Sequence, residues 1–157
     1  MISTVIKQAA GRVPVLAGVG GMSTREGIEH ALIGKNAGAD GLMIASPAYS
    51  VPTQDEIADH MRAVVDAAGI PAVLYDYPSR IGVSIEAEAL DVLADHPLIV
   101  GIKEASGDLA RLPLPADALA RAGIGPEALA EARGTSRLAT VVEAVADRAR
   151  LADQANN

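Results

Sequence analysis

Four apolar, β-branched runs recur along this chain at nearly constant spacing, and this period restricts its fold more than any other feature. The runs cover residues 13–18, 41–46, 72–77 and 98–104. Each has the length of a strand and is apolar enough to be buried on both faces. Segments with helical periodicity separate them, so a strand, a loop, a helix and a turn repeat about every 28 to 30 residues. Consecutive units of this kind predict an α/β fold with about four parallel strands.

Helix start signals lie between the strand runs. Ser23 is followed three residues later by Glu26, and Thr53 by Glu56. In such a capping box, the hydroxyl and the carboxylate satisfy free amide groups at a helix start. Ser84 precedes a third apolar-periodic segment. We therefore expect helices to begin at these three hydroxyl residues.

The pattern changes near residue 108. Pro113 and Pro115 break the chain, and residues 116–132 and 137–153 have the composition of Ala/Arg/Glu helices. We expect two parts: βα units over residues 1–108 and a helical C-terminal appendage over residues 109–157. A closed βα barrel needs eight strands, so four strands form either a small open sheet or part of a barrel.

Composition excludes several classes of function. The net charge of −7 and the pI near 4.8 argue against nucleic-acid and anionic-membrane partners, which need a basic surface. Without Phe or Trp, the chain has no aromatic platform for bases. Zero Cys excludes disulfides and thiolate metal sites, and the three histidines share no local spacing, which favours surface or interface positions over a metal site. No apolar run is long enough to span a membrane, so a cytoplasmic location is expected.

Chemically useful side chains gather where the predicted strands end. In parallel αβ proteins, functional groups lie at the carboxyl ends of strands. Residues 75–80 read Tyr-Asp-Tyr-Pro-Ser-Arg, and residues 103–107 read Lys-Glu-Ala-Ser-Gly. Residues 18–21 follow the first strand and suggest a phosphate-binding loop, but the third position of the dinucleotide fingerprint is Ser23. A sharp turn explains these glycines better.

Lys103 is the most informative single residue. It lies within an apolar strand run, where an ammonium group would be poorly hydrated. A desolvated lysine becomes nucleophilic enough to form a Schiff base with a carbonyl compound. The other interpretation is a strand-end lysine that pairs with Glu104 or reaches solvent. Tyr75, at the neighbouring strand end, is either a proton relay for imine chemistry or an ordinary core tyrosine.

Together these segments resemble the dihydrodipicolinate synthase and N-acetylneuraminate lyase family, the pyruvate-dependent class I aldolases built on a TIM barrel. Residues 101–107, Gly-Ile-Lys-Glu-Ala-Ser-Gly, are similar to the family's Schiff-base strand. Residues 74–82, Leu-Tyr-Asp-Tyr-Pro-Ser-Arg-Ile-Gly, are similar to the strand of its catalytic tyrosine. The resemblance implies that Lys103 condenses with pyruvate and that Tyr75 transfers protons.

Two more site residues follow from the resemblance. Residues 46–49, Ser-Pro-Ala-Tyr, resemble a family loop that donates an aromatic side chain into the neighbouring subunit's site, which implies that role for Tyr49. An arginine in the place of Arg80 binds the carboxylate of the aldehyde substrate in the synthase branch. The resemblance therefore implies a dihydrodipicolinate synthase-like lyase acting on pyruvate and an aldehyde, with no cofactor or metal and with a homo-oligomeric assembly.

The resemblance covers about residues 5–108. The family's Gly-Thr-Thr-Gly-Glu loop, which binds the pyruvate carboxylate, has no counterpart in the sequence. We therefore expect a partial barrel whose turnover is impaired. Two alternatives remain open: a non-catalytic half-barrel that serves as a binding or assembly module, and a small nucleotide-binding protein that uses residues 18–21.

Overall fold

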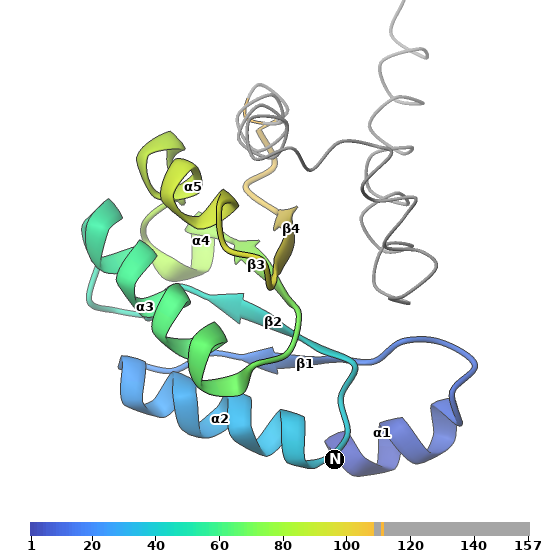
Figure 1. The fold of residues 1–157 in the computed structure, drawn as a ribbon. Coiled ribbons are helices and arrows are strands. Elements are labelled where there is room, and N and C mark those ends of the chain that lie inside the picture. The colour runs from blue at the N-terminus through green and yellow to red at the C-terminus, as the bar shows by residue number, and fades with distance from the viewer. Residues whose placement is uncertain (109–110, 112–157) are drawn as a thin grey trace, which may run out of the picture.

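In the part of the chain that the structure describes, four parallel strands form one sheet (Figure 1). The computed structural model describes residues 1–108 and 111. The strands β1 (Leu16–Val19), β2 (Gly41–Ala45), β3 (Ala72–Asp76) and β4 (Ile99–Glu104) lie in the order β1-β2-β3-β4. The prediction of about four parallel strands is confirmed. The first strand begins three residues later than expected, because Pro14 has no amide hydrogen for a ladder and Val13 is exposed.

The described residues also form five helices: α1 (Ile2–Ala9), α2 (Thr24–Asn36), α3 (Gln54–Ala68), α4 (Pro78–Ile81) and α5 (Ala87–Ala94). Helices α2, α3 and α5 lie along one side of the sheet (Figure 1). The one-turn helix α4 was not expected from the sequence, which placed a loop there. Within residues 1–108 and 111, no helix is long and apolar enough to cross a membrane.

The helix starts agree with the sequence in two cases out of three. Thr53 and Glu56 form a reciprocal capping box at α3. At α2, the Ser23 hydroxyl accepts the amide hydrogen of Glu26, but the Glu26 carboxylate binds the Met22 amide instead of closing the box. The expected start at Ser84 is wrong, since α5 begins at Ala87. Ile85 is 1% exposed and donates its amide to Asp76, which keeps this stretch outside the helix.

The two faces of the sheet differ in what they contact. Because side chains alternate along a strand, register partners share a face. The helix face carries apolar side chains that pack against α2, α3 and α5: Ala17, Val19, Leu42, Ile44, Ala72, Leu74 and Ile99. The opposite face, here called the far face, carries Gly18, Met43, Val73 and Gly101 in one row and Ala45, Tyr75 and Lys103 in the next. The register between β3 and β4 shifts between Ala72 and Val73, which is why Ile99 and Gly101 lie on different faces although they are two residues apart.

The core therefore lies on the helix face. Its large side chains include Leu42, Ile44, Ile57, Met61 and Leu93, all fully enclosed. These buried side chains are all aliphatic, in a chain that has no Phe or Trp. The helical appendage expected over residues 109–157 lies outside the described residues, apart from Arg111.

Candidate active site

The carboxyl ends of β3 and β4 bring two predicted site residues together. Tyr75 and Lys103 are register partners on these adjacent strands, and both point to the far face. The Lys103 Nζ lies 4.1 Å from the centre of the Tyr75 ring. This distance is that of a cation–π contact, in which the electron-rich ring face attracts the ammonium group.

A row of rings and cations continues from this pair. The ring centres of Tyr75 and Tyr77 lie 5.5 Å apart, with their planes tilted by 31°. The Arg80 guanidinium lies 5.9 Å from the centre of the Tyr77 ring. The structure therefore joins Lys103, Tyr75 and Arg80 through Tyr77, a residue that the sequence analysis did not single out. The row thus joins an amine, two phenol rings and a guanidinium, and its members Lys103, Tyr75 and Arg80 are three of the residues predicted from the sequence.

The apolar strand run predicted a poorly hydrated Lys103, but the structure shows this side chain exposed. This is because it stands on the far face of β4, the last strand of the described sheet. It does not pair with Glu104 either. The Glu104 carboxylate lies on the helix face, where it accepts the Ser106 amide and faces Arg111. The structure thus places the ammonium group against an aromatic ring at the water boundary.

Tyr49 stays outside this row. It follows β2 in a loop and is 87% exposed, with Val51 close behind it at 59%. Both residues have a positive φ, 73° at Tyr49 and 46° at Val51. Side chains of this size rarely adopt such angles, so the loop holds a strained backbone that presents the Tyr49 ring to solvent.

A cluster of charges lies behind the row, on the helix face. Arg111 Nη2 is 3.2 Å from Asp76 Oδ2, and Arg111 Nη1 is 3.1 Å from both carboxylate oxygens of Glu86. Its Nε lies 3.5 Å from Glu104 Oε2. Asp76 follows Tyr75 in β3, and Glu104 follows Lys103 in β4. One guanidinium thus hydrogen-bonds Asp76 and Glu86 and makes an ion-pair contact with Glu104, in which its Nε forms no hydrogen bond. We call Asp76, Glu86, Glu104 and Arg111 the strand-end cluster.

Burial governs the electrostatics of this cluster. It raises the pKa of Asp76, which is 1% exposed, and the nearby charge of Glu104 raises it further, while the Ile85 amide and Arg111 act in the opposite direction. Burial disfavours the charge on Arg111, but the hydrogen bond and charge of Glu86, with the charges of Asp76 and Glu104, outweigh it and raise the Arg111 pKa. The guanidinium therefore stays charged, and its charge favours the ionised form of the buried Asp76 carboxylate.

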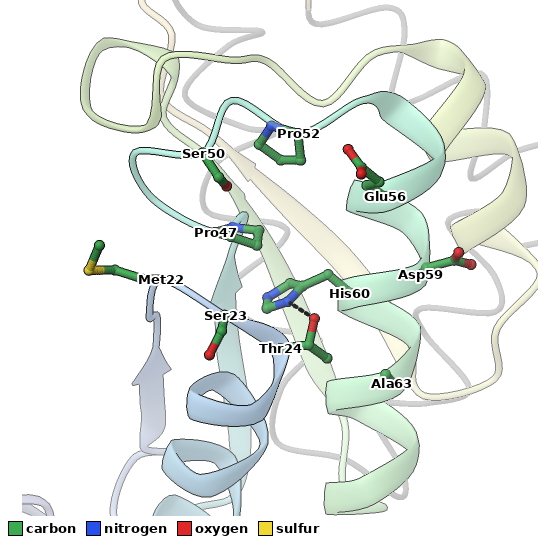
Figure 2. Close-up of a pocket in the computed structure, with 10 residues that line it drawn as sticks. All are labelled: Met22, Ser23, Thr24, Pro47, Ser50, Pro52, Glu56, Asp59, His60 and Ala63. Carbon is green, nitrogen blue, oxygen red and sulfur yellow. Dashed lines mark hydrogen bonds between the residues drawn. The ribbon is translucent and has the colours of Figure 1, made fainter.

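A cleft of about 630 Å³ opens at another place, between the start of α2, the loop after β2 and α3. Figure 2 shows His60 pointing from α3 toward Thr24, with 3.0 Å between His60 Nδ1 and the Thr24 hydroxyl. The cleft is lined by Met22, Ser23, Thr24, Pro47, Ser50, Pro52, Glu56, Asp59, His60 and Ala63.

His60 corrects the expectation that the histidines occupy surface or interface positions. It is 3% exposed, and burial lowers its pKa against the opposing effect of a hydrogen bond to the Ala45 backbone. It therefore ties α3 to α2 and β2 as a neutral ring. Among the described residues, no group of three or more histidine and carboxylate side chains is arranged to hold a metal ion.

The glycine loop at residues 18–21 does not favour a nucleotide site. The Glu26 carboxylate accepts the Met22 amide at 2.9 Å, and a Cβ added to Gly21 would lie 2.9 Å from the Glu26 Cβ. A carboxylate thus already occupies the amide group through which a phosphate would be bound at this helix start.

Sequence reasoning missed Tyr77, Asp76, Arg111 and His60. Strand alternation offered a signal for Asp76, since a residue directly after Tyr75 must lie on the opposite face. Arg111 gave none, because it is 35 residues from Asp76 along the chain. His60 carried a weak signal, its position on the apolar stripe of α3.

Comparison with known proteins now identifies the fold. Residues 1–116 match the Dihydrodipicolinate synthetase family. The 4-hydroxy-tetrahydrodipicolinate synthase of Nitrosospira multiformis is 48% identical over 111 residues, which are 71% of this chain and 37% of that protein. That of Hyphomonas neptunium is 46% identical over 112 residues, 71% of this chain and 38% of its own length.

Solved structures agree. The chloride-inhibited dihydrodipicolinate synthase of Acinetobacter baumannii, complexed with pyruvate, superposes with a TM-score of 0.70 at 36% identity, covering 78% of this chain and 41% of that one. The chain spans less than two fifths of the length of the curated relatives it matches. Its four strands correspond to part of the family's TIM barrel. On this evidence the chain belongs to the dihydrodipicolinate synthetase family.

Proposed function

We propose that the chain is a pyruvate-dependent Schiff-base lyase of the class I aldolase type, resembling 4-hydroxy-tetrahydrodipicolinate synthase. The observation that carries the proposal is the pairing of Lys103 with Tyr75, register partners whose ammonium nitrogen and ring centre are 4.1 Å apart. The family match supports it, as does the pyruvate bound to the Acinetobacter baumannii relative.

In this proposal, the neutral Lys103 amine attacks the keto carbon of pyruvate. The carbinolamine that forms loses water, and the carbon–nitrogen double bond remains. The Tyr75 phenol passes protons to the leaving hydroxyl and back, as general acid and base. An enamine derived from this imine then adds to the aldehyde, and hydrolysis frees Lys103.

Arg80 is proposed to bind the carboxylate of the aldehyde substrate. A planar guanidinium binds both carboxylate oxygens at once. Arg80 lies in α4, and its guanidinium is placed over the Tyr77 ring, on the same side of the sheet as Tyr75 and Lys103. The acceptor is therefore expected to be an aldehyde that carries a carboxylate.

We also propose that Tyr49 acts in a neighbouring subunit. Its ring is 87% exposed on a strained loop, with Val51 beside it at 59%. Exposed apolar side chains next to one another favour self-association. Light scattering should then give a mass above that of the 16.0 kDa chain, and Tyr49→Ala should weaken the assembly. A monomer at micromolar concentration would contradict this part.

A non-catalytic half-barrel that serves as a binding or assembly module is the second candidate. The exposure of Lys103 favours it, because a hydrated ammonium group is a poor nucleophile. Incubation with pyruvate and borohydride separates the two candidates. A lyase leaves a reduced adduct on the peptide that contains Lys103, detectable by mass spectrometry after proteolysis. A binding module leaves none.

A further inference from the structure

Arg111 stands behind the proposed site without touching it. It contacts the carboxylates of the strand-end cluster on the helix face, whereas Tyr75 and Lys103 lie on the far face. Each of these two residues directly precedes a carboxylate that Arg111 contacts, Asp76 in β3 and Glu104 in β4. Asp76 and Glu104, which Arg111 contacts, are therefore the direct chain neighbours of Tyr75 and Lys103.

The charges explain why the two strand ends need this residue. Asp76 and Glu104 are register partners, and their side chains are 1% and 8% exposed. Two carboxylates this close and this dry repel each other strongly. Among the described residues, Arg111 is the cation that contacts both, since its Nη2 lies 3.2 Å from Asp76 and its Nε lies 3.5 Å from Glu104.

Arg111 also holds the segment that follows α4. Its Nη1 donates to both Glu86 oxygens at 3.1 Å, and its Nη2 donates to the Ile85 carbonyl at 3.0 Å. Asp76 in turn accepts the Ile85 amide at 3.2 Å. The guanidinium thus links β3, β4 and the chain downstream of Arg80, and five donors in a fixed plane suit this geometry better than a lysine would.

We propose that Arg111 is a positioning residue for the reaction. By neutralising Asp76 and Glu104, it holds the ends of β3 and β4 at the register that sets the Lys103 ammonium over the Tyr75 ring. The effect of Arg111 on the reaction rests on the proposed function. Its effect on the position of Lys103 over the Tyr75 ring does not, because that position involves no substrate.

The test uses the full chain and two readouts. The chain has three lysines, and Lys7, Lys35 and Lys103 are all exposed. Among the described residues, Lys103 is the lysine that lies over an aromatic ring. Protons held over an aromatic ring resonate upfield, so the ε-methylene signal of Lys103 should be shifted away from the other two; Lys103→Ala assigns it. In Arg111→Gln, this shift should collapse toward the values of Lys7 and Lys35. The rate of pyruvate trapping by borohydride should fall on the order of 10²-fold, as expected when a reacting group is misplaced.

Three further variants make the outcome specific. Arg111→Lys keeps the charge but cannot reach three carboxylates at once, so it should lose part of the shift and part of the trapping rate. Asp76→Asn combined with Arg111→Gln removes the repulsion and should recover part of both. The matched control is Arg62→Gln, because Arg62 donates one hydrogen bond to the Val92 carbonyl, far from the cluster in the chain. It should leave both readouts unchanged.

The readouts also keep the two proposals apart. If the wild-type chain traps no pyruvate, the proposed function fails, and the Lys103 shift still decides the positioning role. If circular dichroism shows that Arg111→Gln does not fold, Arg111→Lys and the double variant carry the comparison. A wild-type shift and wild-type trapping rate in the folded arginine variants would overturn the positioning role.

Discussion

The helix face and the far face of the sheet come from the same four strands but have different contents. On the helix face, Leu42, Ile44 and Leu74 are at most 2% exposed and pack against α2, α3 and α5. On the far face, Gly18 and Lys103 are exposed and Tyr75 is half-buried, while Val73 and Gly101 are buried. The first face contains the packing that stabilises the chain, and the second contains the groups proposed to react.

This difference has a physical basis. Apolar burial stabilises a fold in proportion to the area removed from water, and polar groups reduce it. A face that carries an exposed lysine and a half-buried tyrosine therefore contributes less to that burial than the helix face. Substitutions on the two faces should consequently separate loss of reaction from loss of stability.

The largest expected effect is a complete loss on the far face. Lys103→Ala should abolish the pyruvate–borohydride adduct, because no other amine has the Tyr75 ring beside it in the described sheet. The free energy of unfolding should change by no more than about 0.5 kcal/mol, as for other exposed positions. Mass spectrometry and urea unfolding measure the two quantities. Lys35→Ala is the control and should keep the adduct; an adduct that persists in Lys103→Ala would place the chemistry elsewhere.

Adjacent residues of β2 compare the faces directly. Ile44 lies on the helix face and is fully buried, while Met43 lies on the far face and is partly exposed. Ile44→Ala should lower the free energy of unfolding by roughly 2–5 kcal/mol, the usual cost of an emptied core site. Met43→Ala should cost clearly less. Urea titration gives both values, and equal losses would show that the far face is packed as tightly as the core.

The sheet could be predicted from the sequence because its signal is local. Each strand run is apolar and short, and a helix start signal follows each of the first three, so number, order and parallel direction follow from the period. The start of α5 could not be predicted in this way, because the amide of Ile85 binds Asp76, nine residues earlier, and this keeps Ile85 outside the helix. A long-range hydrogen bond decided that boundary.

The site was predictable in part, for a similar reason. Lys103 and Tyr75 were found from strand ends and from the family resemblance, and the structure places them 4.1 Å apart. The exposure of Lys103 was not predictable, because an apolar run does not say which face of a strand is covered. Tyr77 was passed over because its contact with Arg80 forms through the turn of α4, which was not expected.

Two glycines test the same comparison at smaller scale. A Cβ added to Gly34 in α2 would lie 2.6 Å from the Ala17 Cβ, whereas one added to Gly18 meets nothing within 4 Å. Gly34→Ala should therefore force α2 away from the helix face and cost about 1–3 kcal/mol, as overpacking usually does. Gly18→Ala on the far face should be nearly neutral. Thermal or urea unfolding distinguishes them, and a neutral Gly34→Ala would mean that α2 is free to shift.

The smallest expected effect is a pH dependence that His60 gives to the helix side. Burial lowers the pKa of His60 below its ordinary value of 6.5, so the folded chain binds fewer protons than the unfolded chain just below that pH. The free energy of unfolding should therefore be constant above about pH 6.5 and should fall as the pH drops toward the folded-state pKa. Urea unfolding between about pH 8 and pH 5 covers this range.

His60→Asn should flatten the decrease, while His30→Gln, a change at an exposed ring, should leave it in place. The raised pKa of Asp76 acts in the opposite direction, because the folded chain then binds more protons as the pH falls. That contribution is common to the wild-type chain and to His60→Asn, so it cancels in their difference. A difference that stays constant from pH 8 to pH 5, within about the error of such titrations, would mean that His60 does not stay neutral in the fold. The hydrogen bonds of His60 to Thr24 and to the backbone of Ala45, the register partner of Tyr75, would then not hold α3 in place in the way described above.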